Sequence, residues 1–318
     1  MKTLNKIIPF LFVLLLVSCE DVFEEDISDD TIEVVSPKDN TTIESNVVNF
    51  QWNEIDGAKK YRLQVLDINQ TIVVDSLVAK TSLNIPLLTG SYQWKVRGEN
   101  FAYESKYSGI SNFSMVTTDD LSNQQVVLTS PDNNVYKNSA DVTIKWQKLA
   151  AATSYYVEVI NTTTSESVYK AESTTETSVT LNSTNLTKDA NYQWKVRGIN
   201  STSQTAQFSS RNFFIDTVVP GVPVNSLPAV NAIITNNVST TFTWVSPTDT
   251  GTIQSPLLYT IEFSNTSTFT TILFPTNNAS TSYQRIFTTL GDYYWRIKTT
   301  DAAGNVSAYS VPFKFTVI

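Results

Sequence analysis

The heptapeptide Tyr-Gln-Trp-Lys-Val-Arg-Gly occurs twice in this chain of 318 residues, at Tyr92–Gly98 and Tyr192–Gly198, and a looser copy follows at Tyr293–Thr299. In each copy the residues alternate, so that Tyr, Trp and Val or Ile share one face and the polar residues share the other. This period of two predicts a half-buried β-strand. Because the same strand recurs at a fixed interval, we expect a structural module that is repeated along the chain.

The six tryptophans extend this repeat over most of the chain. They form three pairs, which are Trp52 and Trp94, Trp146 and Trp194, and Trp244 and Trp295. In each pair the first tryptophan ends a short alternating segment, and the second lies in the heptapeptide or its looser copy. After residue 31 no stretch has a convincing helical period. Short alternating strands separated by polar turns predict an all-β chain of tandem β-sandwiches, with the tryptophans at their centres.

The repeat also sets the expected limits of the domains. We expect one sandwich at 31–118, a second at 119–216 and a third at 217–318, preceded by a signal peptide at 1–18 and an acidic tether at 19–30. The segment between the second and third sandwiches, Asp216–Pro228, contains three prolines, which favour an extended connector.

The pattern of aromatic residues resembles that of fibronectin type III domains. Each unit has a Trp on its second strand and a Tyr opening its third, and the first two have Tyr-x-Trp-x-Val-Arg-x-x-Asn on their sixth. Leu88 before Tyr92 and Leu290 before Tyr293 resemble the tyrosine corner of that family. The resemblance implies three fibronectin type III-like (Ig-like) sandwiches. It implies little about activity, because this fold serves many functions.

The first nineteen residues have the pattern of a secretory signal. Lys2 and Lys6 precede an apolar run at Ile7–Val17, which is shorter than the roughly twenty residues that cross a bilayer. The run ends in Leu-Val-Ser-Cys, which resembles a bacterial lipobox and implies cleavage before Cys19 and acylation of that residue. The alternative is an ordinary signal peptide beside a coincidental cysteine.

Seven of the eleven residues in 20–30 are acidic, and such a segment is expected to be solvated and extended. The cluster also resembles the surface-export signal of Bacteroidota lipoproteins, in which the matching residues are Glu20, Asp21, Glu24, Glu25 and Asp26. This resemblance implies a lipoprotein of the outer membrane that faces the cell surface. A lipoprotein facing the periplasm is the alternative.

The composition argues against catalysis and against nucleic acid. The chain has no histidine, and its one cysteine is Cys19, so nucleophile–histidine pairs are impossible and thiol chemistry is excluded if Cys19 is acylated. No glycine-rich phosphate loop and no calcium-loop spacing are present. A net charge of −8 does not suit a phosphate backbone. We expect a protein that is not an enzyme and that has no cofactor or metal.

The loop after the sixth strand of the first unit contains the candidate binding residues. Tyr107 matches Phe208 and Tyr309 of the other units, which indicates a structural role, whereas Phe101 and Tyr103 have no counterparts. Exposed aromatic rings in such a loop suit stacking on a sugar or insertion into a partner's pocket. In the alternative interpretation both rings fold back over the end of the sandwich.

Two functions of different classes follow. The first is a cell-surface binding or adhesion module, held in the outer membrane by its lipid and binding a glycan, beside an outer-membrane importer, or an extracellular protein. The second is a structural accessory subunit docked on an outer-membrane protein complex. An exposed aromatic platform favours the first function, and a broad apolar flank without a cleft favours the second.

Overall fold

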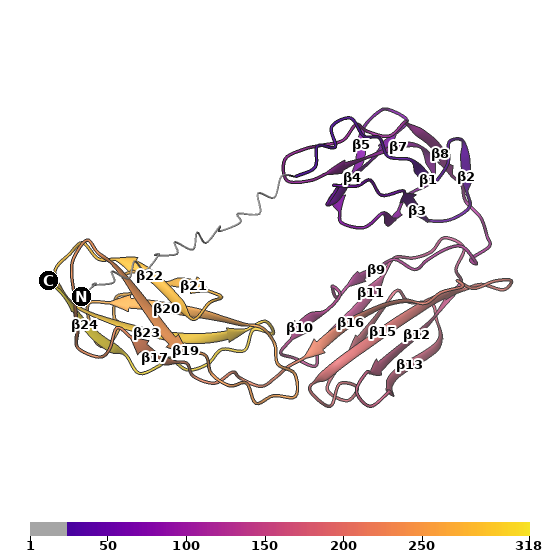
Figure 1. Ribbon diagram of the computed structural model, residues 1–318. Coiled ribbons are helices and arrows are strands. Elements are labelled where there is room, and N and C mark those ends of the chain that lie inside the picture. Colours follow the sequence, from indigo (N-terminus) through magenta and orange to yellow (C-terminus); the bar gives the residue numbers. More distant parts are fainter. Residues whose placement is uncertain (1–23) are drawn as a thin grey trace, which may run out of the picture. The chain divides into compact units, whose positions relative to one another are not determined.

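The computed structural model describes residues 24–318 (Figure 1). The expected signal peptide, Cys19, Glu20 and Asp21 lie outside the described residues. Residues 24–318 form strands β1–β24, and no helix among them is long and apolar enough to cross a membrane. The chain divides into two compact units, one with the first sandwich and one with the second and third.

The first sandwich consists of strands β1–β8. One sheet has the order β1-β3-β6 and the other has the order β2-β8-β7-β4-β5. Neighbouring strands are antiparallel, except that β2 and β8 are parallel. The strands are β1 Val34–Ser36, β2 Thr41–Ile43, β3 Val47–Trp52, β4 Lys60–Asp67, β5 Ile72–Val78, β6 Ser82–Pro86, β7 Gly90–Glu99 and β8 Ser111–Met115.

The second sandwich repeats this order, with sheets β14-β11-β9 and β10-β16-β15-β12-β13. Its strands are β9 Leu128–Ser130, β10 Val135–Lys137, β11 Val142–Trp146, β12 Ser154–Asn161, β13 Glu166–Thr174, β14 Ser178–Leu181, β15 Ala190–Ile199 and β16 Ser209–Ile215.

The third sandwich has sheets β17-β19-β22 and β18-β24-β23-β20-β21. Its strands are β17 Val224–Leu227, β18 Ala232–Ile234, β19 Ser239–Val245, β20 Leu257–Ser264, β21 Thr276–Asn278, β22 Ser282–Ile286, β23 Gly291–Asp301 and β24 Phe313–Val317. The predicted architecture is confirmed: residues 24–318 are all-β and form three tandem sandwiches of two sheets each.

The repeated heptapeptide lies in β7 and β15, and its looser copy lies in β23. Each of these strands pairs on both sides, with β4 and β8, β12 and β16, or β20 and β24. A strand that pairs on both sides cannot present an edge, so its alternate residues point either into the core or onto the outer face of the sheet. The heptapeptide therefore recurs because it forms the central strand of each sandwich.

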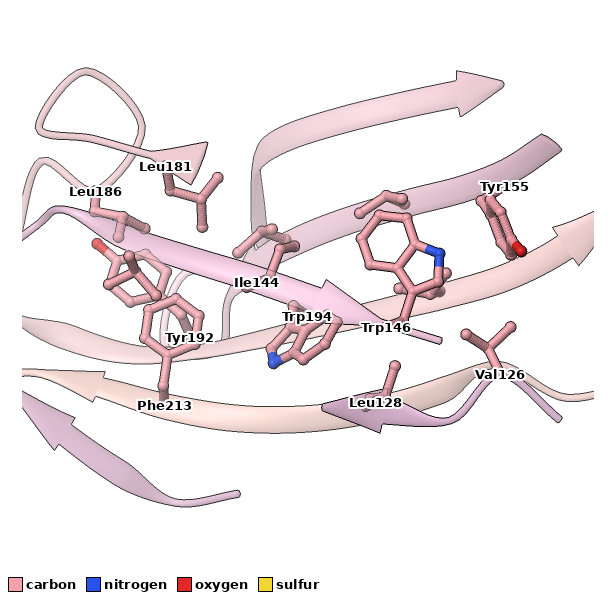
Figure 2. Close-up of a cluster of buried hydrophobic side chains, with 14 of the residues drawn as sticks. Val126, Leu128, Ile144, Trp146, Tyr155, Leu181, Leu186, Tyr192, Trp194 and Phe213 are labelled. Atoms are coloured by element: carbon pink, nitrogen blue, oxygen red, sulfur yellow. The ribbon is translucent and has the colours of Figure 1, made fainter. Parts of the chain in front are cut away.

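Tryptophans occupy the centre of every core. Trp94, Trp194 and Trp295 are fully buried, and the tryptophan of each facing sheet is almost fully buried. In the second sandwich, Trp194 lies among Ile144, Tyr192 and Phe213 (Figure 2). Large aromatic side chains contribute much of the apolar area that a domain buries. Alternation in the sequence thus predicted the correct face of each central strand.

The tyrosine corner is present in all three sandwiches. The Tyr92 hydroxyl donates to the carbonyl of Leu88 at 3.1 Å, as predicted. The Tyr293 hydroxyl donates to Thr289, also at 3.1 Å, and not to the adjacent Leu290. Tyr192 makes the same bond to Lys188 at 2.8 Å, a copy that was not predicted. Because the bond uses a main-chain carbonyl, the corner does not require a leucine.

Candidate functional site

The loop after β7 projects one aromatic ring fully into solvent. Phe101 is 95% exposed and Tyr103 is 37% exposed. The ring of Phe101 therefore does not fold back over the end of the sandwich, whereas Tyr103 is partly covered. Three modules with one fold allow a direct comparison, because features that all three share belong to the fold and features found in one are candidates for function.

Asn100 fixes the conformation of this loop. Its side-chain oxygen accepts hydrogen bonds from the main-chain N–H groups of Ala102 at 3.1 Å and Tyr103 at 2.8 Å. Its side-chain amide donates to the carbonyls of Gly57 at 3.1 Å and Glu25 at 2.8 Å. An asparagine that bonds to main-chain groups just after itself holds a tight turn. Phe101 thus sits at the tip of a fixed turn.

The second sandwich has the same turn without the aromatic residues. Asn200 accepts from the N–H groups of Thr202 and Ser203, and donates to the carbonyls of Ala151 and Asp119. The residues in the places of Phe101 and Tyr103 are Ser201 and Ser203. The turn therefore forms without aromatic side chains, and the fold does not explain Phe101.

The following residues of the loop belong to the shared framework. The ring of Tyr107 lies under Lys95 and Arg97, at 4.4 Å and 5.0 Å from the ring centre. Phe208 and Tyr309 accept equivalent pairs of basic side chains in the other sandwiches. These contacts match the structural role that the sequence indicates for Tyr107.

A network of ion pairs beside the loop is most extended in the first sandwich. Arg97 pairs with Glu99 at 2.8 Å and with Glu104 of the loop at 2.5 Å, and Arg62 pairs with Glu99 at 2.7 Å. Burial alone would raise the pKa of Glu99, but hydrogen bonds from the two arginines outweigh it and hold the pKa below its ordinary value. In each of the other sandwiches the central strand makes a single ion pair with the neighbouring strand, Lys195–Glu158 or Arg296–Glu262, at 2.8 Å.

The chain enters the first sandwich along this same loop. Ile27 is fully buried, the N–H of Lys106 donates to the carbonyl of Asp30 at 3.0 Å, and the Lys106 ammonium pairs with Asp29 at 2.8 Å. The part of the expected tether that the structure describes, residues 24–30, is therefore packed against the sandwich. Acidic composition favours solvation, but one buried aliphatic side chain and several hydrogen bonds outweigh it here.

Gly57 is required for this packing. A Cβ atom at Gly57 would lie 2.7 Å from the Cβ of Glu25 and 3.0 Å from Ile27, and its φ of +76° disfavours other residues. The second sandwich has an equivalent entry at Asp120-Leu121-Ser122, where Leu121 is fully buried. The match between this tripeptide and Asp26-Ile27-Ser28 was the sequence signal for the packed entry, and sequence reasoning missed it.

Of the expected export signal, the structure describes Glu24, Glu25 and Asp26. The side chains of Glu25 and Asp26 are exposed, and Glu24 is half-buried. The main-chain N–H of Ser28 donates to Asp26 at 3.0 Å, and hydrogen bonding to Ser28 lowers the pKa of the Asp26 carboxyl. The contact between Glu25 and Asn100 uses only the main-chain carbonyl of Glu25, so these acidic groups remain accessible.

A shallow groove of about 360 Å³ lies elsewhere on the first sandwich, between the β4–β5 turn and strands β7 and β8. Its amides form a chain in which Gln70 donates to Gln93, and Gln93 donates to Asn112, each at 3.0 Å. Gln193 and Asn212 are paired across β15 and β16 in the second sandwich. Because this pair of a glutamine and an asparagine recurs, the groove is weaker evidence of function than Phe101.

Buried carboxylates occur where the chain enters the third sandwich. Asp216 is fully buried and accepts a hydrogen bond from Ser255 at 2.7 Å. Burial, reinforced by repulsion from Asp301 and Asp249, raises the pKa of Asp216 despite that bond. Asn305 donates to the carbonyl of Asp216 and to the carboxylate of Asp301, each at 2.8 Å. Within residues 24–318, no group of three or more acidic or sulfur ligands is placed to hold a metal ion.

No family model and no curated protein matches the chain. The FN1–FN3 domains of chicken CNTN1 are similar in structure, with 15% identity over 90% of this chain and 97% of that one, and a TM-score of 0.39. A domain segment of titin is 12% identical over 88% and 96%, with a TM-score of 0.39. Fibronectin(III)-like modules of Clostridium thermocellum CbhA are 13% identical over 61% and 93%, with a TM-score of 0.35.

Proposed function

We propose that the chain is a non-catalytic accessory protein, held at a membrane by acylated Cys19, which makes a contact on its membrane side through the loop that contains Phe101. The observation that supports this function most is the double role of Asn100, which binds both the loop and the carbonyl of Glu25. The loop that contains Phe101 and the segment by which the chain enters are therefore at the same end of the first sandwich.

The length of the chain limits how far this loop can be from the anchor. Glu25 follows Cys19 by six residues, which span at most roughly 20–22 Å when fully extended. A ligand on a distant surface is met more readily by parts of a tethered protein that are far from the tether. The position of Phe101 therefore favours the accessory function over adhesion.

Three carboxylates on the central sheets fit a function without catalysis. Glu99, Glu158 and Glu262 are all engaged by basic side chains, and a carboxylate held in this way is a poor general acid or base. The ion pairs of Glu158 and Glu262 lie at corresponding places in the second and third modules, where Lys195 and Arg296 lie opposite them. The repetition of this pair fits a structural role better than a catalytic one.

The anchor is tested with Cys19→Ala. We expect the variant to leave the membrane fraction or to stay unprocessed. A variant that is cleaved normally and still sediments with membranes would exclude the lipid anchor.

The contact is tested by labelling. Ala102→Cys introduces a thiol at an exposed loop position, and Leu88→Cys introduces a control thiol at a residue that is 83% exposed near the other end of β7. We expect a membrane-impermeant maleimide to label position 102 more slowly than position 88 in cells, and both equally in purified protein. Equal rates in cells would overturn the proposed contact. Protection of position 102 by soluble polysaccharide would instead support glycan binding.

A double variant tests whether the rings serve the fold. Replacing Phe101 and Tyr103 by Ser copies the second sandwich. We expect the free energy of unfolding to change by only about 0.5 kcal/mol, because exposed substitutions usually have small effects. Protection of position 102 should be lost in the same variant. A large drop in melting temperature would assign both rings to the fold.

A further inference from the structure

The entry end of the first sandwich is defined here as residues 24–31, 54–58 and 100–106. Among these residues, the exposed large apolar side chains are Phe101 and Tyr103. Ile27 is fully buried and Ile55 is half-buried. The apolar surface at this end thus consists of one ring that is almost fully in solvent and a second ring, in the same loop, that is partly covered.

This area is too small to form a stable interface with a protein by itself. An aromatic side chain buries about 150–250 Å², whereas each partner in a stable protein complex contributes about 800 Å². An aromatic ring at a membrane–water interface needs no such area when another group already holds the protein there, because tethering makes the contact intramolecular. Tyrosine and tryptophan are enriched at that interface, and phenylalanine is common on the apolar face of segments that lie in it.

The electrostatic character of the entry end further limits the surface that it can approach. Its sequence contains eight acidic residues and one lysine, Lys106. Two of these acids are paired, Asp29 with Lys106 and Glu104 with Arg97. The excess negative charge opposes approach to a surface of anionic headgroups within about a Debye length. A contact here must therefore be apolar and must weaken as the membrane becomes more anionic.

We infer that the ring of Phe101 enters the interfacial layer of the bilayer that holds the acyl anchor, with Tyr103 at the level of the headgroups. The inference rests on the anchoring proposed above. Asn100 holds the turn so that Phe101 is presented at the end where the chain leaves towards Cys19. The lipid anchor supplies the affinity, and the ring fixes which end of the first sandwich faces the membrane.

The test uses the acylated full-length protein in phosphatidylcholine vesicles. The one native cysteine, Cys19, is consumed by its lipid, so Ala102→Cys and Leu88→Cys each provide a single site for a fluorophore. We expect lipids with a spin label near the headgroup to quench the probe at 102 severalfold more than the probe at 88. Phe101→Ser should abolish this excess, and phosphatidylglycerol should reduce it unless salt is added.

Three quenching results in vesicles would overturn the inference. These are equal quenching at the two positions, quenching at 102 that survives Phe101→Ser, and quenching that increases with phosphatidylglycerol.

Protection of position 102 in native membranes but not in lipid vesicles would assign the contact to a membrane protein; the lipid contact would then be wrong and the accessory function would stand. If the full-length protein floated with vesicles no better than the Cys19→Ala protein, the anchor itself would be wrong. Thermal melts of each variant establish that it is folded.

Discussion

The side-chain amide of Asn100 donates a hydrogen bond of 2.8 Å to the carbonyl of Glu25, which joins positions 75 residues apart. The oxygen of the same side chain accepts from the N–H of Tyr103 at 2.8 Å. One residue thus fixes both the exposed turn and the segment by which the chain enters the first sandwich.

Asn100→Asp separates these two roles. The carboxylate keeps the acceptor for the turn and removes both N–H donors. We expect residues 100–103 to keep their conformation and segment 24–30 to loosen, at a cost of about 0.5–1.5 kcal/mol for each lost bond. Hydrogen exchange of the Lys106 N–H, which donates to Asp30, reports the loosening. Asn200→Asp is the matched control and should leave Lys106 unchanged; unchanged exchange in Asn100→Asp would contradict the assigned role.

Trp94→Ala and Trp194→Ala each remove a fully buried indole. We expect a loss of about 3–5 kcal/mol, the usual cost of truncating a large buried aromatic residue, which can exceed the stability margin of a small domain. Denaturant unfolding followed by circular dichroism measures the loss. Melting within a degree of the parent protein would mean that neither indole supports its core.

Asp216 should make folding stability depend on pH. Because its pKa in the folded protein is raised above 3.8, the folded state holds this proton more tightly than the unfolded state. The stabilising contribution is therefore complete below the unfolded-state pKa and is lost as pH rises through the folded-state pKa. Other carboxylates titrate in the same range, so the informative quantity is a difference between variants.

Asp216→Asn isolates that contribution. We expect the variant to gain stability relative to the parent protein as pH rises from about 4 to 7, an interval that starts near the ordinary pKa of an aspartate. Melting temperatures of the full chain across this range measure the difference. Asp132→Asn, at a side chain that is 94% exposed, is the control. A difference that is flat with pH would show that Asp216 is charged in the folded protein as readily as in the unfolded chain.

Replacing Glu20, Asp21, Glu24, Glu25 and Asp26 by Ala tests the export signal. We expect acylation to persist and exposure at the cell surface to be lost, as measured by digestion with protease added to whole cells. Packing of the entry should survive, since Asn100 binds the main chain of Glu25. Equal digestion of variant and parent would leave these acids with no role in export.

The strands could be predicted from the sequence because polar and apolar residues alternate along them. In β7, Trp94 and Val96 are fully buried while Lys95 lies on the outer face, and a period of two is visible without any structure. Contacts that use main-chain atoms leave no such pattern. The bond from Tyr192 to Lys188 and the bond from Asn100 to Glu25 were missed for this reason, because their acceptors are carbonyls that any residue supplies.

The packed entry was missed for a second reason. Composition over eleven residues predicts the behaviour of the average residue, whereas the packing depends on one buried side chain, Ile27, and on a few specific hydrogen bonds. A similar limit applies to the tryptophans. Trp94 donates its N–H to the carbonyl of Pro37 at 3.0 Å, but in the second sandwich Arg211 donates to the matching carbonyl of Pro131. Among the described residues the Trp194 N–H has no hydrogen-bond partner. Trp94 and Trp194 lie in identical heptapeptides, so this difference between them cannot be seen in the sequence.

The packed entry segment also determines how the chain responds to tension. A pull on the residues before Glu24 first loads the bond from Asn100 to Glu25 and the bond from Lys106 to Asp30, not the ladder of β7. Rupture of these bonds and of the Lys106–Asp29 ion pair, with release of Ile27 from its buried site, frees residues 24–30. These seven residues span roughly 23–25 Å at full extension. Under load, the first sandwich can thus release residues 24–30 and so extend its N-terminal tether, while its sheets stay folded.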